Sequence, residues 1–419
     1  MDTTVITNVW RPLYDELVTG FRLLTPEWGK LKSLKNFKQM SLRSINWPVD
    51  LLYGGGIAIT YDGGPTTRAT SNAPVEATDS WVHMAGRFEI SYDAFTMNAD
   101  SRVKRQQIKK QLAYQVRDKL RAFQKRMSVM FYGKNDNVLC LVAGAESAQT
   151  VIELDDLYGI SGLTFTASDL FRAGKDYVAF LDTSSSDAIL DIVQVTAVDD
   201  STTAITVSAA VTVADGDKVV LANHISNVSA DTNHDGTADG NTVGFNGLLS
   251  LCSDTTVHNI SGSTYPEWTA STDEALSAAL SGAKLYKAFE LAHKESGYRP
   301  DFAYTTIGAI AAGGGSELDQ RRYNAKDDTM RLGFRSLNVM GVPVEGMLFC
   351  PAGHFFAGSS SALRKLAPDE DTKVVKTGGP QEFAFYGSQL GYYRDQVFRA
   401  QLTAISRKAL VHYTAVTES

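Results

Sequence analysis

The chain has 419 residues, 43% of them hydrophobic, and a formal net charge of -7. This length predicts two or three domains, or one core with excursions. No run approaches the ~18 apolar residues that a membrane helix requires, and the first ten residues lack the basic start and apolar run of a secretory signal. Three distant cysteines, Cys140, Cys252 and Cys350, argue against a disulfide framework or a zinc site. They favour small buried side chains in a reducing cytoplasm.

Residues 1–45 have the pattern of an extended or partly helical arm. Four apolar residues recur at spacings of three between basic residues, which predicts a short amphipathic helix over 31–40. Pro48 should break any helix before it, because the residue preceding a proline is excluded from the helical region.

A long two-stranded excursion is predicted over 46–96. Residues 50–62 form a strand candidate interrupted by glycines, 62–80 are polar and rich in turn residues, and 82–92 alternate as a half-covered strand does. A lone hairpin is marginal in water, so we expect it to lie on a neighbouring subunit. The contacts expected between subunits lie on its covered face: Phe88 and Ile90.

A long basic helix should follow, from about residue 100 to 131. Its apolar side chains recur at spacings of four and three, and thirty residues make a rod of about 45–50 Å. Ten basic residues lie between 100 and 126, whereas most of the charged residues between 153 and 239 are acidic. The chain can therefore present different charges on two sides. The basic face has two interpretations that stay open, an inner face near DNA or salt bridges to acidic neighbours in a shell. The residues assigned to the inner face are Lys104, Arg105, Lys109 and Lys110.

Residues 157–225 are predicted to form a separate small β-barrel or sandwich. Strand candidates rich in Val, Ile and Thr alternate there with turn signals at short, even spacings. The module and the hairpin would then be excursions from one α+β core.

The C-terminal half is predicted to mix helices and strands. A helix is expected from the capping box of Ser271 and Glu274 to Gly297. Residues 302–375 should alternate short strands and helices, with the glycines at 313–315 in a flexible loop.

This order of parts resembles the Hong Kong 97 fold of tailed-phage major capsid proteins. That family has an N-terminal arm, an E-loop hairpin, a spine helix and interleaved P- and A-domains. The hairpin resemblance rests on WPVDLLYGGGIAITYDGG and WVHMAGRFEISYDAF, and that of the second P-domain helix on NGLLSLCSD and YPEWTASTDEAL. The segment LGFRSLNVMGVPVEGMLFCPAGHFFAG resembles the A-domain strands of that family. The segment DQVFRAQLTAISRKALVHYTAV resembles its closing strand. The implied division is 1–45 arm, 46–96 E-loop, 97–156 P-domain with spine helix, 157–225 inserted β-module, 226–300 P-domain continuation, 301–390 A-domain and 391–419 C-terminal strand.

The resemblance implies a structural protein and not an enzyme. It would be a major capsid protein, made in the host cytoplasm, that self-assembles as pentamers and hexamers into the icosahedral shell of a bacteriophage virion. The implied partners are further copies of the chain, non-specifically bound double-stranded DNA, a portal, a separate scaffolding protein and a decoration protein, without a membrane. Some members crosslink through a lysine near the hairpin tip and an asparagine in the last strand. Residues 62–80 contain no lysine and the strand has Asp395 and Gln396 instead, so no such covalent lattice is expected.

The motifs of common hydrolases, metalloproteases, redox proteins and nucleotide-binding proteins do not occur, and the seven histidines are interpreted as structural. One segment places oxygen ligands at alternate positions ahead of a turn glycine, as calcium loops do: Asp231, Asn233, Asp235 and Asp239. Thr242 stands where such loops carry a glutamate, so an Asx-rich surface turn is the favoured interpretation. Calcium is thus the one candidate cofactor.

Two other functions stay open. A nanocompartment shell protein that encloses protein cargo would share the fold but not the DNA. A calcium-binding phage tail or adhesin protein built around 157–242 would form trimers or fibres, and it leaves the order of hairpin and helix unexplained.

Overall fold

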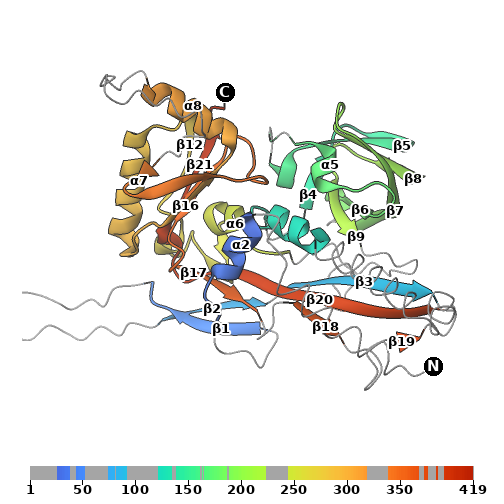
Figure 1. Ribbon diagram of the computed structural model, residues 1–419, viewed down its shortest axis with the longest axis horizontal. Helices are drawn as coiled ribbons and strands as arrows, with labels where there is room; N and C mark the ends of the chain where they lie inside the picture. Colours follow the sequence, from blue (N-terminus) through green and yellow to red (C-terminus); the bar gives the residue numbers. More distant parts are fainter. Residues whose placement is uncertain are drawn as a thin grey trace, which may run out of the picture. The chain divides into compact units, whose positions relative to one another are not determined.

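The computed structural model describes residues 26–37, 44–51, 74–80, 82–91, 121–134, 138–160, 163, 165–185, 188–222, 244–318, 338–367, 372–375, 384–385 and 391–418. They form mixed α and β structure (Figure 1) and belong to two compact units. The first unit takes residues 1–33, 81–128 and 366–401, and the second takes the rest. Within the described part, no helix is both long and apolar enough to cross a membrane.

The first unit is organised around the long strand β20 (Gly391–Ala404). β3 (Val82–Ser91) runs antiparallel to it from Gly391↔Ser91 to Ala400↔Val82, and the two ribbons lie side by side in Figure 1. β18 (Thr372–Val375) and β19 (Ala384–Phe385) also pair with β20. Helix α2 (Pro26–Ser33) and helical residues 121–128 also belong to this unit.

Two expectations for the N-terminal region were wrong. The helix expected over 31–40 ends at Ser33, because the backbone of residues 35–37 pairs instead with Lys365. The strand expected as the return arm of the hairpin is β3, whose partner is β20, so Phe88 and Ile90 lie opposite Arg394 and Tyr392 and not in the hairpin. Alternation of side chains predicts a strand but does not name its partner.

The second unit contains the observed hairpin and a six-stranded sheet. β1 (Ser44–Val49) pairs antiparallel with β2 (Val75–Ser80), and the intervening loop lies outside the described residues. The sheet has mixed parallel and antiparallel pairing. Its order is β12 (Thr272–Ala278), β21 (Leu410–Val416), β16 (Phe355–Gly358), β13 (Phe302–Thr305), β15 (Val342–Gly346) and β14 (Asn338–Val339).

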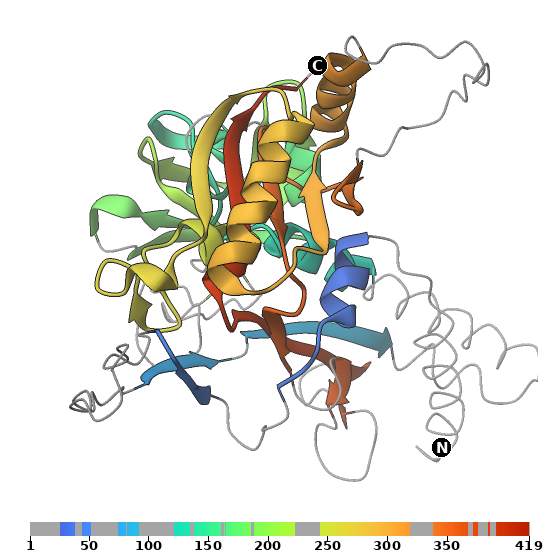
Figure 2. The same ribbon diagram turned by 90° about the vertical axis from the view of Figure 1, so that its left-hand side faces the viewer.

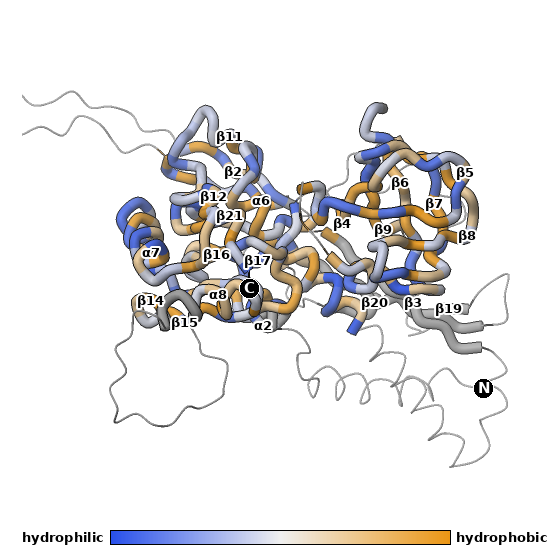
Figure 3. The backbone as a smooth tube through the Cα atoms, turned by 90° about the horizontal axis from the view of Figure 1, so that it is seen from above, coloured by the Kyte–Doolittle hydropathy of each residue, from blue (hydrophilic) through white to orange (hydrophobic). Residues whose placement is uncertain are grey.

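Helix α7 (Gly282–Ser296) lies across this sheet (Figure 2), and its hydropathy alternates along each turn (Figure 3). Leu285 and Phe289 of α7 are buried in one hydrophobic cluster with Phe355 and Val411 of the sheet. The cluster also takes residues from α8 (Ile307–Leu318). The apolar stripe of α7, whose residues recur at helical spacing, thus covers one face of the sheet.

The expected start of this helix was wrong and its expected end was right. Ser271 does not cap a helix, because its hydroxyl donates to the Leu410 carbonyl (2.9 Å) and the next residues form β12 beside β21. The helix begins after Ser281 and ends at Gly297, which has the left-handed φ of 73° that favours glycine. Pairing with β21 therefore overrides the local capping signal.

The glycines expected in a loop at 313–315 lie in helix α8 instead. A Cβ atom on Gly313 would lie 2.7 Å from the carbonyl oxygen of Leu280. The glycine is needed there for a close approach of two backbones and not for flexibility.

The β-module is a closed six-stranded barrel (Figure 1). Its strands are β4 (Val138–Val142), β5 (Glu146–Asp155), β6 (Tyr177–Asp182), β7 (Ala188–Asp199), β8 (Ala204–Val213) and β9 (Lys218–Ala222). The expected boundary at 157 was wrong, since β4 and β5 are needed for closure and a closed barrel leaves no free edge. The barrel also holds α5 (Ala167–Leu170) and the 3-10 turns η1 (Leu157–Gly159) and η2 (Thr183–Ser185).

Short elements join these parts of the second unit. They are α6 (Leu248–Ser253), β10 (Thr256–Val257), β11 (Ile260–Ser261), η3 (Pro266–Trp268) and η4 (Arg407–Ala409). β17 (Leu363–Leu366) is a neighbour of β20 in its sheet. Gly247, just before α6, shows how tightly the short elements pack, because a Cβ atom there would lie 2.3 Å from the Gly133 oxygen.

Candidate functional site at the root of the hairpin

The base of the β1–β2 hairpin is packed through one face. Ile45, Trp47 and Val49 are buried, whereas the residues between them are exposed, as a strand with one covered face requires. Trp47 lies opposite Ala77 in the register, so a large side chain is matched with a small one. We call this buried base of the β1–β2 hairpin the hairpin root. It is where the hairpin packs against the rest of its own unit.

A tight turn between β10 and β11 lies against this root. His258 and Asn259 form its two central residues, and their φ angles of 54° and 64° define the type I′ turn that suits a two-residue hairpin. The indole Nε1 of Trp268 donates to the Val257 carbonyl (3.0 Å) and supports the turn. Residues other than glycine are uncommon in the left-handed region, and asparagine, aspartate and histidine are the ones enriched there.

His258 contacts two consecutive residues of β2. Its carbonyl accepts from the Thr78 N–H (3.0 Å), and its Nδ1 lies 3.0 Å from Oδ2 of Asp79. The Nδ1 contact is an approach of charge and dipole and not an aligned hydrogen bond. Asn246 also donates to Oδ2 of Asp79 (2.9 Å), so the carboxylate is held from two sides.

The other ring nitrogen of His258 faces the end of β20. The Ala404 N–H donates to Nε2 (3.1 Å). Because a backbone N–H can only donate, Nε2 must be unprotonated and the ring hydrogen must sit on Nδ1. The ring is fully buried, with Trp47 at 5.2 Å and Trp268 at 6.2 Å between ring centroids.

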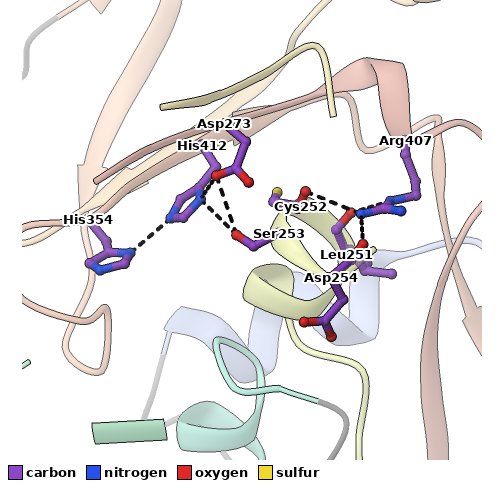
Figure 4. Close-up of polar contacts among 8 residues, drawn as sticks. All are labelled: Leu251, Cys252, Ser253, Asp254, Asp273, His354, Arg407 and His412. Atoms are coloured by element: carbon purple, nitrogen blue, oxygen red, sulfur yellow. Dashed lines mark hydrogen bonds and ion pairs between the residues drawn. The ribbon is translucent and has the colours of Figure 1, made fainter. Parts of the chain in front are cut away.

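A second histidine site lies in the six-stranded sheet, and Figure 4 shows its side chains pointing toward one another. His412 on β21 places Nδ1 2.7 Å from Oδ1 of Asp273 on β12, and its Nε2 lies 2.8 Å from Nδ1 of His354. Burial first, and then the charge of His412, lower the pKa of His354 to about 3, with Asp273 acting in the opposite direction.

The Ser253, His412 and Asp273 set has the composition of a hydrolase triad but not its geometry. The Ser253 hydroxyl lies 3.2 Å from Nδ1 of His412, the same nitrogen that contacts Asp273. In a triad the base contacts its nucleophile and its carboxylate through opposite ring nitrogens. Here Nε2 of His412 contacts buried His354 and not the serine. The contacts of His412 therefore link β12 to β21 and do not place a base beside a nucleophile as a triad does.

Arg407 bonds backbone groups beside both histidine sites, and Figure 4 shows it next to the end of α6 on the His412 side. Arg407 is 1% exposed, and its guanidinium donates to the carbonyls that end α6, those of Leu251 (2.6 Å), Cys252 (3.2 Å) and Asp254 (2.7 Å). It also donates to the carbonyl of Trp268 (2.7 Å), beside the hairpin turn. These donors satisfy helix-end carbonyls that would otherwise lack partners.

The predicted site residues fall mostly elsewhere. The four basic residues assigned to an inner face (104, 105, 109 and 110) and the four calcium ligands (231, 233, 235 and 239) lie outside the described residues. No group of three or more His, Cys, Asp or Glu in the described part could hold a metal ion. The expectation that the cysteines are small buried side chains is confirmed, because all three are buried.

The sequence offered a weak signal for the hairpin root. A histidine followed by asparagine between two short β-branched segments, at 257–260, is compatible with a tight turn. This pattern does not predict which residues contact His258, because Asp79 and Ala404 are far away in the chain.

Comparisons with known proteins come from structure and not from sequence. No family model and no curated protein matches the chain. It is similar to a capsid chain of cyanophage A-1(L), with 13% identity, 95% of this chain and 94% of that chain covered, and a TM-score of 0.49. It is also similar to the capsid of a native GTA particle (10% identity, 95% and 93% covered, TM-score 0.45). An encapsulin from Synechococcus elongatus is a third (11%, 94% and 89%, TM-score 0.41).

Phage capsids are thus among the structures to which this chain is similar, as the sequence resemblance predicts. The identities are low and each TM-score is below 0.5. The function therefore has to be argued from the chain's own residues.

Proposed function

We propose that this chain is the major capsid protein of a tailed phage and not an enzyme. Copies of it would assemble as pentamers and hexamers into an icosahedral shell around double-stranded DNA. Its work would be done by interfaces, in which many modest contacts add up through multivalency.

The order of parts along the chain supports this proposal. Helix α2, the β1–β2 hairpin, strand β3 and the helix at 121–130 follow one another, and the six-stranded sheet comes later. This is the order of arm, E-loop, spine helix and A-domain that the Hong Kong 97 resemblance implies. The barrel, which begins directly after that helix at Val138, would be the inserted module.

The course of the last strands is the observation that carries the proposal. β20 pairs with β3, and after the turn η4 the chain continues as β21, which lies between β12 and β16 in the six-stranded sheet. One C-terminal segment therefore supplies a strand to each of two sheets, as the closing strand of that fold is expected to do.

Finer assignments of residues are proposed from the sequence. Lys104, Arg105, Lys109 and Lys110 would face the packaged DNA, and Phe88 and Ile90 of β3 would contact a neighbouring subunit. Binding to DNA would be electrostatic and independent of base sequence. A calcium ion at Asp231, Asn233, Asp235 and Asp239 remains a proposal that EDTA and calcium titration of the melting temperature would test.

Negative-stain microscopy of the recombinant chain, alone and with its scaffolding protein, tests the proposed function. Closed polyhedral shells or rings of five and six subunits are expected, and nuclease-protected DNA in particles from infected cells. Shells that hold a protein cargo and no DNA would favour a nanocompartment instead. Persistent monomers or trimers under both conditions would contradict the shell function.

A paired substitution tests the inner face. Changing Lys109 and Lys110 to Gln should shorten the packaged genome at unchanged shell yield, because counterion release at phosphates is lost. The matched control changes Lys284 and Lys287, exposed lysines of α7, to Gln. A fall in shell yield at full genome length would favour salt bridges between subunits.

A further inference from the structure

We propose that His258 is a positioning residue for shell assembly, an inference that rests on the proposed function. His258 contacts the root of the β1–β2 hairpin through its carbonyl and its ring, and its Nε2 accepts from the N–H of the last residue of β20. The ring would thereby fix the direction in which the hairpin leaves its own domain to reach a neighbouring copy.

The backbone at His258 has the conformation of a tight hairpin turn. Residue 258 occupies the first central position of a type I′ turn with φ of 54°. Asn, Asp and Gly are the residues that such turns favour, since they tolerate the left-handed region at little cost. Histidine is also among the residues enriched in the left-handed region, so the turn accepts it and its side chain is free to contact other elements.

The contacts of His258 come from two strands that do not pair with each other. Thr78 and Asp79 of β2 meet its carbonyl and its Nδ1, and the Ala404 N–H of β20 meets its Nε2. Asn and Gly can form the same turn, but neither reaches β2 and β20 with a planar ring that carries one donor and one acceptor on opposite edges.

Packing leaves the ring no alternative position. It lies edge-on between Trp47 of the hairpin and Trp268 of η3, and its side chain is fully buried. The Trp268 carbonyl is held by Arg407, whose other bonds end α6. A rotation of the hairpin root about the domain would therefore break the contact with Ala404 or open a gap beside Trp47.

The side chain can be removed without spoiling the turn. His258→Asn puts a residue favoured by the type I′ turn at this position, so the chain should fold while the link to Ala404 is lost. Asn259→Gly is the matched control, because it relieves the neighbouring left-handed position and leaves His258 intact. Both variants are made in the full-length chain.

Two measurements decide the proposal. In the unassembled chain, the amide proton of Ala404 should exchange roughly tenfold faster in His258→Asn than in wild type, the factor expected from the loss of about one hydrogen bond. The amide proton of Thr78, which donates to the backbone carbonyl of residue 258, should keep its wild-type exchange rate. In assembly reactions, His258→Asn should give roughly tenfold fewer closed shells than Asn259→Gly, with open or irregular particles in their place.

The outcomes separate this inference from the function on which it rests. Unchanged amide exchange at Ala404 in His258→Asn would overturn the link at the root. Faster exchange with a normal yield of closed shells would overturn the positioning role in assembly. A wild-type chain that forms no shells would contradict the proposed function, while the exchange experiment would still decide the link.

Discussion

His258 and His412 are both buried, and each brings Nδ1 close to an aspartate, but different atoms face their Nε2. At His258 that atom is a backbone N–H, the donor of Ala404. At His412 it is Nδ1 of His354, a second imidazole nitrogen. The contact to the aspartate also differs, since it is an aligned hydrogen bond only at His412.

The difference decides what each ring holds in place. Nε2 of His258 accepts from a backbone N–H, so this ring contacts the end of β20. Nε2 of His412 meets a second imidazole, so that ring contacts another side chain. The neighbour opposite the second nitrogen, and not the residue type, therefore sets the structural role of each histidine.

The largest expected effect would break both sites at once through Arg407. Arg407→Met leaves four carbonyl groups without their donors, and each unsatisfied buried group costs about 1–3 kcal/mol, so we expect a loss of about 4 kcal/mol in the free energy of unfolding. Urea unfolding measures it. Arg364→Met is the control, because that guanidinium bonds two local carbonyls at the surface. Equal losses in the two variants would contradict a special role for Arg407.

An intermediate effect concerns pH at the His412 site. Unfolded His354 takes up a proton near pH 6.5, whereas folded His354 does so only near pH 3. The unfolded state therefore binds more protons between these values, and stability should fall as pH falls through this window, by at most about 1.4 kcal/mol per pH unit from this group. His354→Gln should flatten that slope, measured by urea unfolding from pH 7 to pH 4.

Ser253→Ala is the control for this experiment, because it alters the same network without removing a titratable group. It should keep the wild-type slope. A His354→Gln variant with the wild-type slope would mean that burial of His354 does not govern the acid sensitivity of the sheet.

The smallest expected effect is at the residue next to Arg407. Lys408 forms a salt bridge of 3.2 Å with Glu295, and both side chains are partly exposed. Lys408→Ala should cost about 0.5 kcal/mol, and salt should weaken the contribution further. A loss comparable to that of Arg407→Met would show that burial does not separate these adjacent charges.

The elements that local chemistry controls could be predicted, and their partners could not. The alternation in 82–92 predicted a strand, and Gly297 marked the end of α7, because both signals act within a few residues. Ser271 and Glu274 carried an equally local signal for a helix start, but pairing of β12 with β21 overrode it. The partner of β3 lies about three hundred residues further along the chain, so no window of sequence could name it.

The sequence by itself determined the buried character of the cysteines, the strand-rich module and the resemblance to capsid proteins. These depend on composition, periodicity and the succession of elements, which are properties of neighbours in the chain. Only the tertiary structure decided that His258 joins a turn to β2 and β20, that His412 shares a hydrogen bond with His354, and that Arg407 bonds backbone groups beside both sites. The role of a buried polar side chain depends on which distant donors and acceptors it meets, and folding alone brings those together.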